Sequence, residues 1–133
     1  MKSRRDRPEI VTISWRDVPA QVNGVHGRLR HQIVLSPKFQ RAIDRAKRKA
    51  RITTAQDDVA QWRRTSTAGQ GDVVAAAAAE AARLERVYST QYLAQLAYVG
   101  GYAADLPPHV GRPDDHHPLA PGGAGTGRQE DRA

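Results

Sequence analysis

The spacing of apolar residues changes at Ser36 and Pro37, and this change constrains the fold more than any other feature of the sequence. Before it, apolar and polar residues alternate over residues 11–15 and again over residues 29–35, which is typical of half-buried strands. After it, apolar residues recur at three- and four-residue spacing, the pattern of an amphipathic helix. Serine is a good N-cap, and proline at the first helical position loses no hydrogen bond. The sequence therefore predicts an α+β fold.

The two alternating segments are expected to pair as a two-stranded antiparallel hairpin with a long connection. That connection, residues 16–27, contains Pro19, which argues against the interior of a regular strand. It also contains Asn23 and Gly24, which favour a turn. Because two strands alone are only marginally stable, helices are expected to cover one face of the hairpin.

Three helices are predicted, near residues 37–51, 54–64 and 72–99. The second begins at Thr54, with Asp57 three residues later as in a capping box. The third passes through five consecutive alanines, which favour a helix but bury little area per turn. Only seven of the 133 residues are aromatic, so the core must consist mainly of aliphatic side chains.

The domain is predicted to span residues 9–104, between a flexible leader (1–8) and a Pro/Gly-rich tail (105–133). The tail has too few bulky aliphatic residues to offset the entropy lost on ordering, so it is expected to be disordered. The sequence has no run of about 20 apolar residues and no apolar segment after its basic first residues. A cytoplasmic location without membrane association is therefore expected.

The residue types argue against most kinds of reaction centre. The absence of cysteine excludes disulfides, thiolate catalysis and cysteine-ligated metals. The glycines match neither a Walker A loop nor a dinucleotide-binding fingerprint. The histidines and aspartates between His109 and His117 lie in the predicted tail, without the fixed geometry of a metal site. We therefore expect no catalytic, cofactor or metal site, and a protein that is not an enzyme.

Positive charge is concentrated at one end of the chain. Residues 1–51 contain fourteen Lys and Arg against four Asp and Glu, whereas the remainder contains seven against ten, for a net charge of +7. Such a field attracts polyanions or acidic protein surfaces. The alternative is a solvated face that only keeps the protein soluble. The candidate partner-binding residues are Arg16, Asp17, Arg28, Arg30, Arg41, Arg45, Arg48 and Lys49.

Two types of partner fit this charge. The first is an acidic protein. The second is nucleic acid, bound through phosphate contacts that weaken as salt rises. The chain lacks a helix-turn-helix pair, a zinc finger and an aromatic stacking platform, so any nucleic-acid binding is expected to be non-specific. The oligomeric state does not follow from the sequence.

Several strings of residues resemble the small bacterial virulence factor domain family. They are Ser-Trp-Arg-Asp-Val-Pro-Ala at 14–20, Phe-Gln-Arg-Ala-Ile-Asp at 39–44, and Trp-Arg at 62–63, and the resemblance covers about residues 9–87. The family domain is similar to the terminal part of a larger conserved virulence factor of Gram-positive cocci. The resemblance implies no catalytic residue. It implies an accessory protein, because stand-alone members accompany genes of folate or corrinoid one-carbon metabolism.

Two residues within these strings have no evident packing role in the sequence. Arg16 and Asp17 end a predicted strand, so they are the better functional candidates. The preferred hypothesis is a non-enzymatic accessory protein that docks on an acidic partner through the loop at 16–27 and the basic face of the first helix. A third alternative is a small hydrolase or transferase that uses His31 as a general base with Asp17 as its orienting group.

Overall fold

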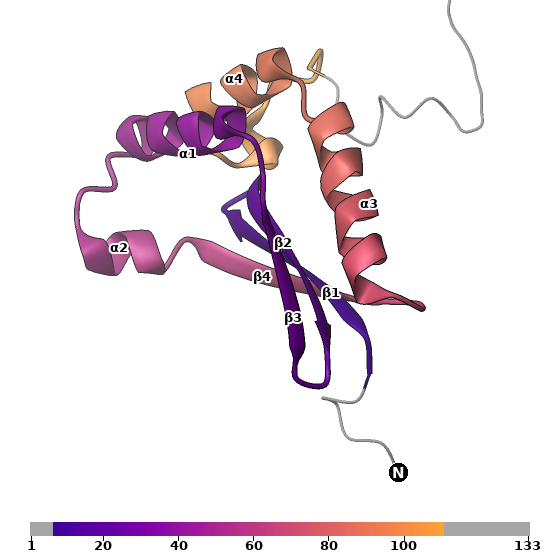
Figure 1. The fold of residues 1–133 in the computed structure, drawn as a ribbon. Helices are drawn as coiled ribbons and strands as arrows, with labels where there is room; N and C mark the ends of the chain where they lie inside the picture. Colours follow the sequence, from indigo (N-terminus) through magenta and orange to yellow (C-terminus); the bar gives the residue numbers. More distant parts are fainter. Residues whose placement is uncertain (1–6, 111–133) are drawn as a thin grey trace, which may run out of the picture.

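A four-stranded antiparallel sheet forms the centre of the computed structural model, which describes residues 7–110 (Figure 1). The order of the strands across the sheet is β3-β2-β1-β4. The α+β class is therefore confirmed, but the prediction of a two-stranded hairpin is wrong. The strands are β1 (Glu9–Trp15), β2 (Val18–His26), β3 (Leu29–Val34) and β4 (Trp62–Ala68). The helices of the described part are α1 (Pro37–Ala50), α2 (Ala55–Val59), α3 (Val73–Val87), α4 (Thr90–Tyr98) and the short 3-10 helix η2 (Ala103–Asp105).

Most of the predicted loop at 16–27 is the strand β2. The chain reverses at Arg16 and Asp17 alone, and Arg16 adopts a φ of 52° to make this tight turn. Pro19 is tolerated because it sits opposite Ser14, where the pairing of β1 and β2 shifts register. Proline is found at such irregularities, since they do not require every backbone N–H.

The strand β4 replaces the end of the second predicted helix and the linker after it. The helix α2 ends at Val59, and residues 62–68 then pair antiparallel with β1 along its full length. All seven residues of β4 are exposed, so no alternation of apolar residues marks the strand in the sequence. The one signal was the run from Thr65 to Thr67, because threonine favours strands.

The long third helix is in fact two helices. A break at Tyr88 and Ser89 separates α3 from α4, and the Ser89 hydroxyl accepts a hydrogen bond of 3.0 Å from the backbone N–H of Tyr92. Serine at this position is a typical N-cap, so it starts a new helix. The break lets α4 pack on α1, while α3 runs along the sheet (Figure 1).

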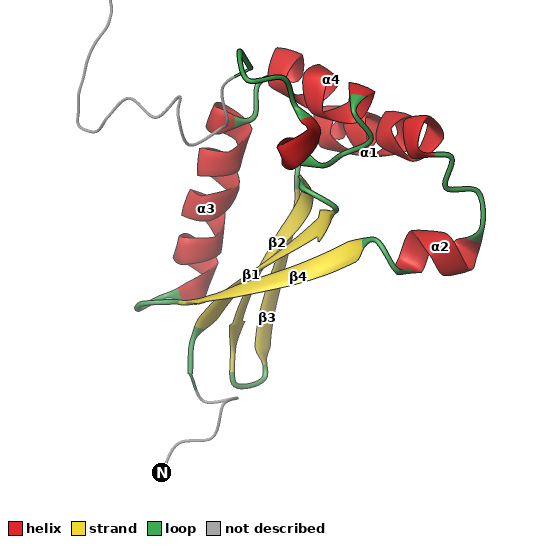
Figure 2. Cartoon of the chain, turned by 180° about the vertical axis from the view of Figure 1, so that it is seen from behind, coloured by secondary structure: helices red, strands yellow, loops and turns green. Residues whose placement is uncertain are grey.

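The core lies where the sheet meets α1, α3 and α4 (Figure 2). The helix α3 packs on the face of the sheet that carries Ile10, Val22 and Gly24. Val11 and Trp15 are fully buried, as the alternation over residues 11–15 predicts, whereas Ile13 is only half-buried. The largest fully buried side chains are Trp15, Phe39, Ile43, Leu93 and Leu96.

The first residues of the predicted tail belong to the packed domain. Leu106 and Val110 are partly buried and pack against the core. The rest of the predicted tail and residues 1–6 of the leader lie outside the described residues. Within residues 7–110, no helix has the length and apolar character needed to cross a membrane.

Candidate interaction surface

Five of the cations of α1 lie on one side of this helix. Their spacing of three and four residues, with Lys49 next to Arg48, places them on the same helical face. The opposite side of α1 is apolar and buried in the core. We call this set the basic face of α1: Lys38, Arg41, Arg45, Arg48 and Lys49.

Three members of the basic face have no counter-ion within residues 7–110. Arg41, Arg45 and Arg48 are exposed, and none of them forms an ion pair with a residue that the structure describes. Lys49 lies 4.3 Å from the ring centroid of Tyr98, so its ammonium is partly engaged in a cation–π contact. The three arginines are therefore the part of this surface with positive charge available to a partner.

The start of α1 is held by Glu85 of α3. The carboxylate accepts 2.7 Å hydrogen bonds from both the backbone N–H and the hydroxyl of Ser36, and it lies 3.8 Å from the Lys38 ammonium. A negative charge at the N-terminus of a helix is favourable, because it compensates the helix dipole. This arrangement fixes the position of the basic face relative to α3.

A groove runs between α1 and α4 along the edge of the basic face. Its volume is about 130 Å³. Small alanine residues of both helices border the groove, and its rim carries three of the cations. The lining residues are Lys38, Arg41, Ala42, Arg45, Thr90, Leu93, Ala94 and Ala97.

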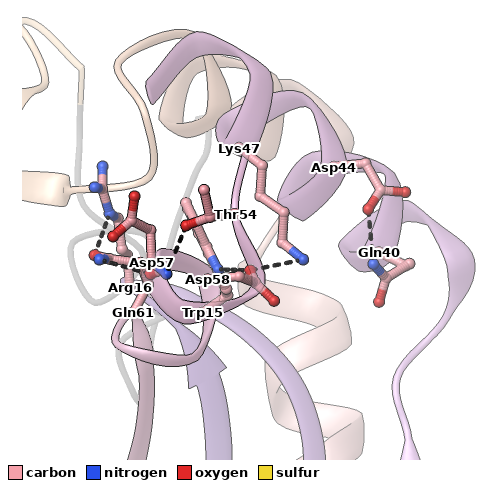
Figure 3. A network of polar contacts seen from close by, with 9 residues as sticks. All are labelled: Trp15, Arg16, Gln40, Asp44, Lys47, Thr54, Asp57, Asp58 and Gln61. Atoms are coloured by element: carbon pink, nitrogen blue, oxygen red, sulfur yellow. Dashed lines mark hydrogen bonds and ion pairs between the residues drawn. The ribbon is translucent and has the colours of Figure 1, made fainter. Parts of the chain in front are cut away.

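Lys47, the cation of α1 that lies outside the basic face, links this helix to Asp58 of α2. The Lys47 ammonium lies 2.9 Å from its carboxylate, which also accepts a 2.8 Å hydrogen bond from the indole N–H of Trp15 (Figure 3). The bond from Lys47 is the main reason why the pKa of Asp58 is below its usual value. The indole N–H of Trp15 lowers this pKa further, while burial opposes the shift. Lys47 is thus occupied within the fold.

Replacing Asp58 with asparagine should destabilise the domain by about 1 kcal/mol at pH 7, because Lys47 loses its ion pair. The lowered pKa means that this stabilisation is complete above about pH 4, near the pKa of an unfolded aspartate, and is lost as pH falls through the folded-state value. Urea denaturation from pH 7 to pH 3 should show the difference from wild type shrinking below about pH 4. Asp57→Asn is the control, since no described residue contacts that carboxylate; an equal loss there would contradict this role of Asp58.

Arg16 joins three parts of the chain. Its side chain donates hydrogen bonds of 2.9 Å to Gln61 Oε1 and 2.8 Å to the carbonyl of Gly100 (Figure 3 shows the first). The guanidinium also lies 4.4 Å from the ring centroid of Tyr102 and 5.0 Å from that of Trp15. Arg16 therefore connects the β1–β2 turn to the start of β4 and the end of α4.

Asp17 makes a second set of contacts at the same corner. Its carboxylate accepts a 2.7 Å hydrogen bond from the backbone N–H of Ala103 and forms a 2.9 Å ion pair with Arg63. The argument that Arg16 and Asp17 lack a packing role is therefore wrong. Sequence reasoning missed it because their partners lie more than 40 residues away along the chain.

The two remaining candidate residues lie away from the basic face. Arg28 belongs to the tight turn between β2 and β3, and Arg30 is near the start of β3. This turn is at the end of the sheet farthest from α1 (Figure 1). The structure therefore brings together Arg41, Arg45, Arg48 and Lys49, and separates Arg28 and Arg30 from them.

His31 and Asp17 are not brought together. His31 pairs with Gly24 near the end of β2, whereas Asp17 precedes the first residue of that strand. Gly24 lies six positions along β2 from Val18, which corresponds to about 20 Å. The hydrolase or transferase alternative requires His31 and Asp17 to lie close together as a general base and its orienting group, and this separation contradicts that requirement. No group of three or more metal-ligand types is present within residues 7–110, and the aspartates and histidines at 114–117 lie outside the described part.

The chain matches a protein-family model. The family model described as Virulence factor matches residues 13–97, from the middle of β1 to the end of α4. No curated protein and no solved structure matches the chain. The matched segment contains the Arg16–Asp17 corner, the basic face of α1 and both walls of the groove. Since it covers more than half of the 133 residues, the chain belongs to the virulence factor family.

Proposed function

We propose that this protein is a non-enzymatic interaction module that binds an acidic surface of a protein partner through the basic face of α1. The observation that carries the proposal is the row formed by Arg41, Arg45 and Arg48, which is exposed and has no counter-ion among the described residues. Unpaired charges of one sign on a rigid helix steer an oppositely charged partner and raise its association rate.

The packing of α1 favours a protein partner over a lipid surface. A basic amphipathic helix that binds membranes must insert its apolar side among the lipids. In α1 that side is already used, since Phe39 is 1% exposed and Ile43 and Ala46 are fully buried. Only the charged side of this helix is available for binding.

Affinity capture with a matched pair of variants tests the proposal. Arg45→Glu/Arg48→Glu reverses charge on the basic face, and Arg28→Glu/Arg30→Glu makes the same change at the far end of the sheet. We expect wild type and the second variant to recover one identified acidic protein from a host lysate, and the first variant to lose it. Reconstitution from purified components should reproduce this difference. The family resemblance makes enzymes of one-carbon or corrinoid metabolism the first candidates.

Nucleic-acid binding is tested on the same variants by fluorescence anisotropy. Labelled DNA and RNA of about 20 nucleotides are titrated at about 50 mM and about 200 mM salt. Micromolar binding that falls steeply with salt and is lost only in Arg45→Glu/Arg48→Glu would assign the basic face to nucleic acid. Recovery of the same protein partner by both variants would also overturn the proposal.

A further inference from the structure

The groove between α1 and α4 has an apolar floor. Ala42 of α1 faces Leu93, Ala94 and Ala97 of α4, and the small alanine side chains leave the space between the helices unfilled. Leu93 and Ala97 are almost completely buried, whereas Ala94 is only half-buried. An apolar group that entered the groove over Ala94 would therefore lose its contact with water at little cost to the protein.

The size of the groove indicates what can enter it. Its volume of about 130 Å³ is well below the range of about 300–1,000 Å³ that is usual for small-molecule sites. It is close to the volume of about 150 Å³ at which a protein cavity accepts benzene. The groove is therefore suited to a single apolar side chain, such as leucine or phenylalanine, rather than to a whole cofactor.

The charge on the rim indicates what must flank that side chain. Lys38 is paired with Glu85, but Arg41 and Arg45 have no ion pair with any described residue. They are four residues apart on α1, so their Cβ atoms lie about 5–6 Å from each other. Thr90 is the first residue of α4, and the N-terminus of this helix adds positive potential at one end of the groove.

From this combination we infer that the groove receives one apolar side chain from an acidic segment of the protein partner, while carboxylates beside that side chain contact Arg41 and Arg45. The inference rests on the function proposed above and specifies the chemistry of the partner segment. A side chain anchored in a desolvated pocket is also typical of a binding hot spot.

A display selection tests this inference. Random 12-residue peptides are selected on the full chain, and the enriched peptides are synthesised with a fluorescent label. We expect each to contain Leu, Ile, Phe or Met with Asp or Glu within four residues. Binding is then measured by anisotropy on Ala94→Leu, which fills the groove without changing the charge, and on Ala82→Leu, the same change at an exposed position of α3.

We expect Ala94→Leu to weaken binding about tenfold or more, which is the loss expected when one apolar side chain is no longer buried. Ala82→Leu should bind as wild type does, and Arg41→Glu/Arg45→Glu should also lose binding. Circular dichroism confirms that each variant is folded. Truncating the apolar residue of the peptide to alanine should weaken binding equally, and this measurement does not depend on the folding of any variant.

Two results separate the failure of this inference from that of the proposed function. In the first result, the selected peptides are acidic but lack an apolar residue, bind Ala94→Leu normally and do not bind Arg41→Glu/Arg45→Glu. This would overturn the inference that the groove receives an apolar side chain, and the charged face would remain as the binding site. Selection of peptides without acidic residues would overturn both. If no peptide is enriched and the protein binds nucleic acid equally well with and without Ala94→Leu, the inference and the proposed function are both overturned.

Discussion

Replacing Gly24 with valine is expected to destabilise the domain by at least about 3 kcal/mol. Gly24 lies in β2 under the first turn of α3, and a Cβ at this position would be 2.5 Å from the carbonyl oxygen of Val73 and 3.0 Å from its carbonyl carbon. Overpacking a core costs about 1–3 kcal/mol when side chains can rearrange. Here the obstacle is backbone, so α3 itself would have to move away from the sheet.

The measurement is urea denaturation followed by circular dichroism. A loss of this size is a large part of the total stability of about 5–15 kcal/mol that is typical of a small domain. Asn23→Val is the matched control, because it introduces valine one residue earlier, where the side chain points to the opposite face of the strand. Equal stability of Gly24→Val and Asn23→Val would show that α3 does not pack on Gly24 in this way.

Replacing Arg16 with alanine is expected to cost about 3 kcal/mol. The variant loses hydrogen bonds from a charged group to Gln61 and to the Gly100 carbonyl, each worth about 1.5–3 kcal/mol, and the stacking over Tyr102. The total is less than the sum of these contributions, because the contacts of Arg16 are partly exposed to solvent. Because the slope of urea unfolding is about 1–3 kcal/mol per molar, the midpoint should fall by roughly 1–3 M.

Arg64→Ala is the control for Arg16→Ala. Arg64 is exposed on β4, and the structure gives it no hydrogen bond or ion pair with a described residue, so its replacement should change stability by less than about 0.5 kcal/mol. If Arg16→Ala unfolds at the same urea concentration as wild type, the contacts of Arg16 do not stabilise the fold. The hypothesis from the sequence that Arg16 binds a partner would then be supported again.

The contrast between Arg16 and Arg45 shows where sequence reasoning about function succeeds and fails here. Both are cations within residues 9–87, the part of the chain that resembles the virulence factor family. The helical spacing around Arg45 was enough to predict that it lies on a charged helical face. The role of Arg16 depends on Gln61 and Gly100, which are 45 and 84 residues away, and no local pattern indicates contacts over such distances.

The local elements that carry their own signal were predictable. The start of α1 at Ser36 and Pro37, its apolar stripe and the first strand all follow from short-range spacing and capping preferences. The strand β4 carries no such signal, because its seven exposed residues are held by backbone pairing with β1. The single serine that ends α3 and starts α4 was overlooked within an otherwise continuous helical pattern.

By itself, then, the sequence determined the α+β class, the boundaries of α1, the side of α1 that carries the charge, and the family. Only the tertiary structure decided that the sheet has four strands, that Arg16 and Asp17 hold a corner, and that a groove opens beside Arg41 and Arg45. The physical reason is the separation along the sequence of the residues that interact. Capping and periodicity depend on residues within one or two helical turns of each other, whereas the pairing of strands and the packing of α4 on α1 join residues tens of positions apart.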